Sequence, residues 1–350
     1  MTSSLPTSRR ELFGRVGDTD VHRYTLAWPG GLTVRLLDYG GVVQSLEAPD
    51  RSGEPGEVVL GFPTLEGYVE NNRPGAARVF LGALIGRYAN RIAGGAFTLD
   101  GVLHRVPVND GKNSLHGGPA GFDTRVWSAA EVPGGLRLRL RSPDGDQGYP
   151  GTLTTEVTYR LVAPGRLSIG YRASTDAPTV VNLTNHTYWN LAGAGAGDVH
   201  GHWLRIPAAR YCPTDENLIP GEVAPVEGTP FDFRQATRIG ARLGAPDRQL
   251  AIAGGYDHNW VLDGRLAAQA WDPVSGRLLT MRTTEPGVQF YSGNHLTADL
   301  GSGAGFALEA QHFPDSPNRP DFPSTVLRPG EVYRQETEYE LTTADGPPAG

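Results

Sequence analysis

Cysteine, lysine and long apolar runs are what this sequence has least of. Its 350 residues include one cysteine, Cys212, and one lysine, Lys112. A lone cysteine excludes an intrachain disulfide and a metal cluster built from several cysteines, and it fits a reducing compartment. No stretch approaches the run of about 18 apolar residues that a membrane-spanning helix needs. The sequence therefore predicts a cytoplasmic protein that does not span a membrane.

An excess of positive charge is also missing, since 31 lysines and arginines stand against 38 acidic residues. The net charge is −7, the isoelectric point is near 5.7, and no basic block occurs, so nucleic acid is not expected as a partner. Residues 8–13 contain the paired arginines of an export signal. The apolar run that such a signal requires does not follow, because residues 14–20 are mostly polar or glycine. We expect residues 1–20 to be a poorly ordered segment.

Helical periodicity is almost missing, and only Gln235–Leu243 is predicted as a short helix. Short stretches with β-branched, aromatic or alternating apolar residues recur instead, separated by turn signals. The predicted strands are Leu32–Asp38, Val42–Ala48, Leu136–Arg141, Leu153–Leu161, Arg166–Ser174, Leu278–Thr284, Val288–Ser292, Phe306–Gln311 and Val332–Leu341. A hairpin is predicted over Ala96–Val106, around Asp100-Gly101.

This pattern predicts an all-β protein, a large antiparallel β-sandwich or barrel with one face of a sheet left open and concave for a ligand. No linker or change of composition divides the chain. We therefore expect a single domain over residues 21–343, followed by a loose tail at 344–350.

The stretch Val180–Leu191 is the most informative one. As a strand, it would alternate between two faces. The mostly apolar face would carry Val181, Leu183, Asn185, Thr187, Trp189 and Leu191. The polar face would carry Asn182, Thr184, His186, Tyr188 and Asn190. A row of hydrogen-bonding groups around a histidine predicts the wall of a site, with His186 as its proton donor.

Three kinds of chemistry find little support. The closest histidine pair, His200 and His202, lies in a glycine-rich loop without the acidic or cysteine ligands of a metal site. Ser114 and Ser292 lie outside the G-x-S-x-G pattern of a nucleophile, and Cys212 has no catalytic partner in sequence. The glycine-rich residues 301–305 lack the lysine of a phosphate loop. No metal and no cofactor are expected.

General acid–base chemistry fits the sequence better. Candidates for proton transfer are His116, His186, Asp257 and Glu309, and Asn90, Arg91 and Gln289 add hydrogen-bonding groups. Amides, arginine and carboxylates together can hold several hydroxyl groups of a sugar. Glu309 stands between apolar residues in sequence, a setting that raises the pKa of a carboxyl towards the range of a general base.

These stretches resemble the aldose 1-epimerase (galactose mutarotase) family from about Tyr24 to Leu341. The most specific motifs are N-R-I at Asn90–Ile92, L-H-G-G at Leu115–Gly118, T-N-H-x-Y at Thr184–Tyr188 and the run Glu309–Glu331. The resemblance implies a galactose mutarotase-like supersandwich with the sugar on an open concave face. It implies an isomerase of carbohydrate metabolism that interconverts the α and β anomers of free aldohexoses such as glucose and galactose.

The resemblance also assigns residues. It implies that Glu309 is the base that takes the C1 hydroxyl proton and that His186 is the acid that protonates the ring oxygen. The implied sugar-binding residues are Asn90, Arg91, His116, Tyr188, Asp257 and Gln289. Ring opening, rotation about C1–C2 and reclosure then exchange the anomers, and no metal or nucleotide takes part.

Three alternatives remain at this point, and the chain is expected to be a monomer or a homodimer. A hexose-6-phosphate 1-epimerase would need a basic cluster, for which Arg73, Arg78 and Arg87 are available. A glycoside hydrolase would use Asp257 and Glu309 across a scissile bond. A non-catalytic carbohydrate-binding protein would bind sugar without interconverting its anomers.

Overall fold

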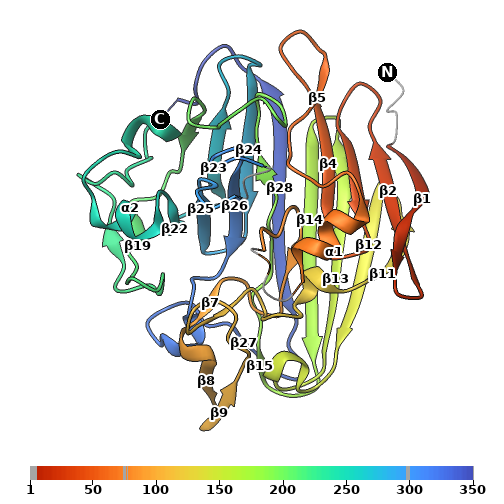
Figure 1. Cartoon of the computed structure of the whole chain (residues 1–350), viewed down its shortest axis with the longest axis vertical. Coiled ribbons are helices and arrows are strands. Elements are labelled where there is room, and N and C mark those ends of the chain that lie inside the picture. The colour runs from red at the N-terminus through yellow and green to blue at the C-terminus, as the bar shows by residue number, and fades with distance from the viewer. Residues whose placement is uncertain (1–5, 74–75, 77, 297–299, 350) are drawn as a thin grey trace.

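The computed structural model describes residues 6–73, 76, 78–296 and 300–349, and strands dominate it (Figure 1). The largest sheet has nine strands, all paired antiparallel. In spatial order they are β11 (Ser128–Val132), β12 (Gly135–Ser142), β13 (Leu153–Ala163), β14 (Arg166–Thr175), β28 (Tyr333–Thr343), β24 (Arg277–Thr283), β23 (Leu266–Trp271), β18 (Trp203–Arg205) and β21 (Thr237–Arg238).

Two further sheets lie beside it (Figure 1). A six-stranded sheet has the order β17 (Tyr188–Trp189), β26 (Phe306–Gln311), β25 (Gly287–Tyr291), β22 (Asp257–Val261), β19 (Arg210–Cys212) and β20 (Ala224–Pro225). A five-stranded sheet runs in chain order through β1 (Thr7–Val16), β2 (Thr19–Ala27), β3 (Thr33–Leu37), β4 (Val43–Pro49) and β5 (Pro55–Glu57).

Short elements complete the fold. Four two-stranded pairs join β10 (Ser114–Leu115) to β7 (Arg91–Ile92), β15 (Thr179–Val180) to β27 (Val326–Leu327), β16 (Thr184–Asn185) to β6 (Leu84–Ile85), and β8 (Ala96–Leu99) to β9 (Val102–Arg105). The α-helices are α1 (Leu65–Asn71) and α2 (Arg248–Ala253). Neither is long and apolar enough to cross a membrane within the described ranges.

The main core lies between the nine-stranded sheet and the two smaller sheets. Its buried side chains come from Tyr24 at one end of the chain to Leu341 at the other. Tyr339 of β28 packs its ring 5.1 Å from that of Trp189 of β17 and donates its hydroxyl proton to the carbonyl of Leu308 in β26. The alternation of side chains between the two faces of a strand explains how the nine-stranded sheet contributes to this core. In β12, Leu136 and Leu138 are buried while Arg137 and Arg139 are exposed.

The stretch Val180–Leu191 is not one strand, so the prediction of a single strand with two alternating faces was wrong. It contains the last residue of β15 and the two-residue strands β16 and β17, and all twelve of its residues are buried. The backbone amides of Asn182 and His186 donate to the carbonyls of Arg87 and Ala83, and those of later residues turn to other segments. A segment that crosses several partners in turn cannot leave one whole face open to solvent.

Asparagine side chains hold this crossing segment. Asn182 donates to the carbonyls of Ala89 and His312 and accepts the amide of His312. Asn185 donates to the carbonyl of Gly82, and Asn190 donates to that of Ala304. Backbone groups that leave the sheet ladders must find other partners when they are buried, and these amides supply them.

Two further expectations were wrong. The amino-terminal segment is ordered from Thr7, because Phe13 and Val16 of β1 pack against apolar side chains and the strand pairs along β2. Most of Gln235–Leu243 is not helical, since only Ile239–Arg242 forms a 3₁₀ turn. The missed helix α2 has Asp247 as its N-cap and a left-handed glycine at its end, which are the usual boundary signals.

Candidate active site

The polar face of the six-stranded sheet forms the floor of the site. Asn259, Gln289 and Glu309 lie opposite one another on β22, β25 and β26. Side chains alternate along a strand, so Asp257 and Tyr291, two positions away, share this face. The intervening Phe290 and Leu308 are buried in the main core. The strand period therefore separates an apolar core face from a face that carries amides and carboxyls.

A cleft of about 240 Å³ opens over this face. It contains the side chains that the motifs singled out, although they are far apart in sequence. Its lining residues are Arg78, Val79, Phe80, Asn90, Arg91, Asp110, Leu115, His116, His186, Tyr188, Leu218, Asp257, Tyr291, His295 and Glu309. A larger groove of about 540 Å³, bordered by Arg23 and Arg35, lies over the five-stranded sheet and has no histidine in its lining.

His186 and Glu309 face each other in the cleft, with 3.6 Å between Nε2 and Oε1. Both side chains are almost fully buried, and the remaining polar atoms, Nδ1 of His186 and Oε2 of Glu309, have no partner within the described part of the chain. Burial lowers the pKa of His186 to about 4. Burial, and then the charge of Asp257, raises the pKa of Glu309 well above its usual value, against the opposing effect of Arg91.

His116 is fixed in one tautomer. The backbone amide of Asn90 donates to its Nδ1 at 3.1 Å, so the ring proton of the neutral imidazole is on Nε2. Burial, followed by the neighbouring His186, lowers the pKa of His116 well below its usual value, which keeps the ring neutral. His116 therefore offers a neutral N–H donor and does not serve as a base.

This tautomer bears on metal binding. One ligand atom each of His116, His186 and Glu309 lies within 4.8 Å of the others, which is close enough to suggest a metal site. A histidine that binds a metal through Nε2 normally carries its proton on Nδ1 and donates it to an acceptor. Here Nδ1 of His116 is an acceptor. The donor set therefore does not fit a metal ion, and we derive no metal chemistry from it.

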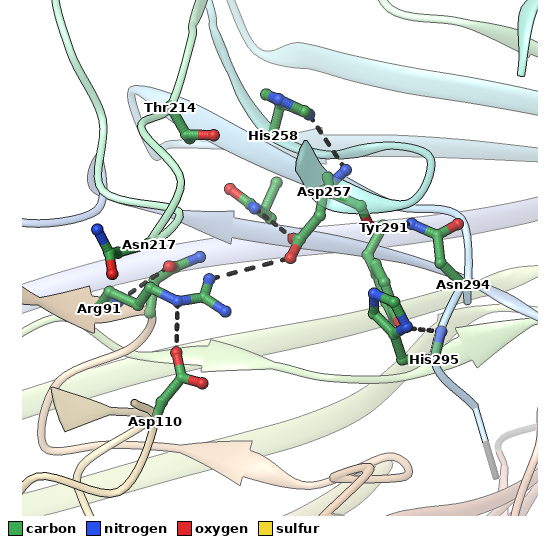
Figure 2. Close-up of polar contacts among 12 residues, drawn as sticks. Arg91, Asp110, Thr214, Asn217, Asp257, His258, Tyr291, Asn294 and His295 are labelled. Carbon is green, nitrogen blue, oxygen red and sulfur yellow. Dashed lines mark hydrogen bonds and ion pairs between the residues drawn. The ribbon is translucent and has the colours of Figure 1, made fainter. Parts of the chain in front are cut away.

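Arg91 lies between two carboxylates at one end of the cleft (Figure 2). Its Nε donates to Asp110 at 2.7 Å, and its Nη1 is 3.9 Å from Asp257. Asp257 in turn accepts a hydrogen bond from Nε2 of Gln289 at 2.7 Å. Gln289 is not among the cleft-lining residues, so it supports Asp257 from behind. The sugar-binding role predicted for Gln289 remains a prediction.

The backbone around the cleft is strained in a consistent way. Phe80, Asn90, His116 and Leu218 all line the cleft and have φ between 52° and 63°. Residues other than glycine rarely adopt this left-handed region, and such positions cluster at functional sites. The conformation at Phe80 places its ring 4.7 Å from that of His116 and 5.7 Å from that of His186. Both imidazoles are thereby packed against an aromatic wall.

The structure brings together seven of the eight predicted residues as lining of one cleft, with Gln289 directly behind it. The sequence did not single out Phe80, Asp110 or Tyr291 as site residues. Asp110 lies five residues before the L-H-G-G motif at Leu115–Gly118. Tyr291 falls two positions after Gln289 in a predicted strand, so alternation could have found it. Phe80 lies in an apolar stretch, two residues before Gly82, and carried no such signal.

The basic cluster expected of a sugar-phosphate enzyme does not form among the described residues. Arg87 is buried away from the cleft, where its guanidinium donates to the carbonyls of Pro150 and Gly151. Arg73 pairs with Glu70 at the surface. Arg78 lines the cleft, but its guanidinium is already paired with Asp123 and lies over the ring of Phe80.

Comparison with known proteins places the chain in a family. A family model described as aldose 1-epimerase matches residues 22–340. The chain belongs to the aldose 1-epimerase family. It is 42% identical to the galactose mutarotase of Rattus norvegicus over 350 residues, which cover 96% of this chain and 98% of the relative. It is also 42% identical to the aldose 1-epimerase of Escherichia coli strain K12, covering 91% of this chain and 94% of that protein.

Solved structures of related proteins have the same fold as this chain. The galactose 1-epimerase of Lactobacillus acidophilus superposes with a TM-score of 0.84 at 29% identity, covering 97% of this chain and all of the other. A homologue from C. elegans superposes with a TM-score of 0.81, also at 29% identity, over 90% and 97% of the two chains. The family and the all-β fold class are thus confirmed, as are mutarotase activity and membership of the isomerases.

The raised pKa of Glu309 predicts how replacing it changes stability. The unfolded chain ionises this carboxyl near pH 4.5, whereas the folded chain holds the proton to higher pH. Wild-type stability therefore falls as the pH rises through that range. Glutamine does not titrate, so Glu309→Gln should melt at a higher temperature than the wild type near pH 8, and this advantage should shrink towards pH 4.5.

Thermal unfolding of both proteins at several pH values measures this difference. Glu338→Gln, on β28 of the nine-stranded sheet, is the control and should show no comparable trend, since its side chain is only half-buried. A melting-temperature difference between Glu309→Gln and wild type that stays constant, or that grows towards acid pH, contradicts a raised pKa at Glu309.

Proposed function

We propose that this enzyme interconverts the α and β anomers of free aldohexoses such as glucose and galactose, with Glu309 and His186 as its proton-transfer pair. The observation that carries the proposal is the 3.6 Å approach of these two groups in a cleft that also presents His116 and Arg91. Relatives named galactose mutarotase and aldose 1-epimerase support the substrate class.

The pair holds one exchangeable proton. Burial disfavours charge on both groups, so the resting site has a neutral Glu309 carboxyl and a neutral His186. Transfer of this proton to His186 gives a carboxylate and an imidazolium without changing the total charge. Bound sugar favours this form, because its hydroxyl groups and the charge of Arg91 replace the hydrogen bonds that water would give.

Ring opening then follows from the charged pair. The Glu309 carboxylate takes the proton of the C1 hydroxyl, and the electrons of that O–H bond form the C1=O double bond. The bond between C1 and the ring oxygen breaks, and its electron pair accepts the proton of His186. The open chain therefore stands beside a neutral carboxyl and a neutral imidazole, the pair that burial favours. Each positioned acid or base typically contributes about 10²–10⁴-fold.

Ring closure reverses these steps on the other face. Rotation about C1–C2 presents the opposite face of the aldehyde, and the ring hydroxyl returns its proton to His186 as its oxygen attacks C1. Glu309 gives its proton back to O1. The neutral N–H of His116 is a donor suited to the carbonyl oxygen of the open form, where negative charge grows during attack.

The remaining residues hold the sugar. We assign hydroxyl contacts to Asn90, Arg91, Tyr188 and Asp257, which offer both donors and acceptors on the cleft wall. Burial raises the pKa of Tyr188 well above its usual value, so its hydroxyl stays protonated as a donor. Gln289 fixes Asp257 through its 2.7 Å hydrogen bond and completes this group.

The partner is a small sugar molecule, and we propose that the chain works in the cytoplasm as a monomer or homodimer. The single cysteine supports this location, since a chain with one cysteine forms no intrachain disulfide, as is usual in a reducing compartment. Cys212 is buried, and burial raises its pKa to about 11, so the thiol is unreactive.

Glu309→Gln should abolish anomer interconversion while sugar still binds. The amide keeps the shape of the carboxyl but accepts no proton from O1, so kcat should fall by at least about 10²-fold. Polarimetry with fresh α-D-glucose measures the rate, and calorimetric titration measures binding. Rates near those of the wild type would show that another group is the base.

Two substitutions at His116 distinguish the effect of its N–H donor on the rate from the effect of its size. His116→Ala removes the donor and should lower kcat by about 10²-fold, the usual cost of losing one such group. His116→Gln keeps an N–H at a similar reach and should recover about tenfold of this loss. Equal rates for the two variants, measured at saturating sugar, would remove the donor role.

A further inference from the structure

The cleft has cationic side chains but no unpaired cation among its described lining residues. Arg78 is paired with the buried Asp123 and donates to the carbonyl of Gly118. Arg91 is shared between Asp110 and Asp257. The single lysine, Lys112, is not a lining residue, and its charge acts on Asp215 instead. Each positive charge is therefore offset by at least one carboxylate.

Asp110 is the least buried of the three carboxylates that pair with Arg78 and Arg91. Its side chain is 36% exposed, whereas that of Arg91 is 10% exposed and that of Asp257 is 18% exposed. Figure 2 shows Asp110 on the opposite side of the Arg91 guanidinium from Asp257. Its Oδ2 binds Arg91, and its Oδ1 has no protein partner within the described ranges. Asp110 thus places a carboxylate with one free oxygen in the wall of the cleft.

The turn that carries Asp110 is held firmly. The backbone amide of Asp110 donates to the carbonyl of Asn113, and the amide of Asn113 donates back to Asp110. Asn113 is buried, donates to the carbonyl of Asn217, and accepts the amide of Gly94. None of these bonds uses the carboxylate of Asp110. The turn should therefore survive a change of that side chain.

We propose that Asp110 is a specificity-determining residue that makes the cleft select neutral sugars over anionic ones. It holds Arg91 by Nε, which leaves the remaining N–H groups of the guanidinium for sugar hydroxyls. It also cancels the charge with which Arg91 would attract a phosphate or a carboxylate. This inference rests on the proposed function, since it names the charge class of the same substrate.

The size of the effect follows from Coulomb's law. The interaction of two unit charges about 6 Å apart in water changes an equilibrium or rate constant about threefold. A doubly charged phosphate doubles this interaction energy, and the change in the constant becomes about tenfold. Asp110→Asn should therefore raise kcat/KM for glucose 6-phosphate, relative to glucose, by about tenfold. For glucuronate, which carries one charge, the relative gain should be about threefold.

The experiment measures exchange between α and β anomers at equilibrium by magnetisation-transfer NMR, for glucose, glucuronate and glucose 6-phosphate. The matched control is Asp20→Asn, because Asp20 also pairs with an arginine Nε, at 2.6 Å from Arg15, and is 44% exposed but lies on β2 outside the cleft lining. The control should leave all three ratios unchanged. Melting temperatures of both variants verify that they fold.

Salt gives a second, independent readout. In the wild type, kcat/KM for glucose 6-phosphate should rise with ionic strength as the repulsion by Asp110 is screened, and Asp110→Asn should weaken this rise. Glucose is uncharged and should show little dependence in either protein. A merely structural role for Asp110 would change the rates for all three sugars alike and leave the salt dependence intact.

The outcomes separate the two proposals. If the wild type does not exchange the anomers of glucose, the proposed function fails. If the wild type does so and Asp110→Asn leaves the ratios for the anionic sugars and their salt dependence unchanged, only the role of Asp110 is overturned. A relative gain that is larger for the phosphate than for the carboxylate supports it.

Discussion

The mechanism that we propose for this enzyme depends on one constraint, the joint burial of a carboxyl and an imidazole. Glu309 and His186 are almost entirely removed from water and lie 3.6 Å apart. Removal from water disfavours the charged form of each, and in the proposed mechanism the pair keeps its proton on the carboxyl until a substrate replaces the lost solvation. In that mechanism the neutral pair is also the one that ring opening produces, so one proton serves as both the acid and the base equivalent.

The fold provides this constraint through two different kinds of backbone. Glu309 belongs to a regular strand, β26, whose alternation directs it to the cleft and its neighbours to the core. His186 belongs to a crossing segment whose buried backbone is held by Asn182, Asn185 and Asn190. Residues in left-handed conformations, among them His116, complete the cleft. The regular sheet gives the site a rigid floor, and the irregular segments bring the histidines over it.

Much of this could be predicted from the sequence, for definite reasons. Alternation located β12, β13, β14 and β26 within one or two residues, because period-2 patterns and turn residues are local signals. The segment Val180–Leu191 was predicted to be one strand, because its irregular pairing depends on partners that local pattern does not reveal. Periodicity marked His186 as a site residue. The apolar sequence neighbours of Glu309 pointed to a general base, and the family resemblance then implied that it takes the C1 hydroxyl proton. The tautomer of His116 depends on the backbone of Asn90 and required the structure.

The protonation state of Glu309 tests the account most directly. Infrared spectra at pH 7, taken as the difference between the wild type and Glu309→Gln, isolate its carboxyl from other buried acids such as Glu57 and Asp123, whose pKa values burial also raises. The sugar-free enzyme should show the carbonyl stretching band of a protonated carboxylic acid, and the variant should lack it. A difference spectrum that shows only ionised carboxylate would contradict the neutral resting pair.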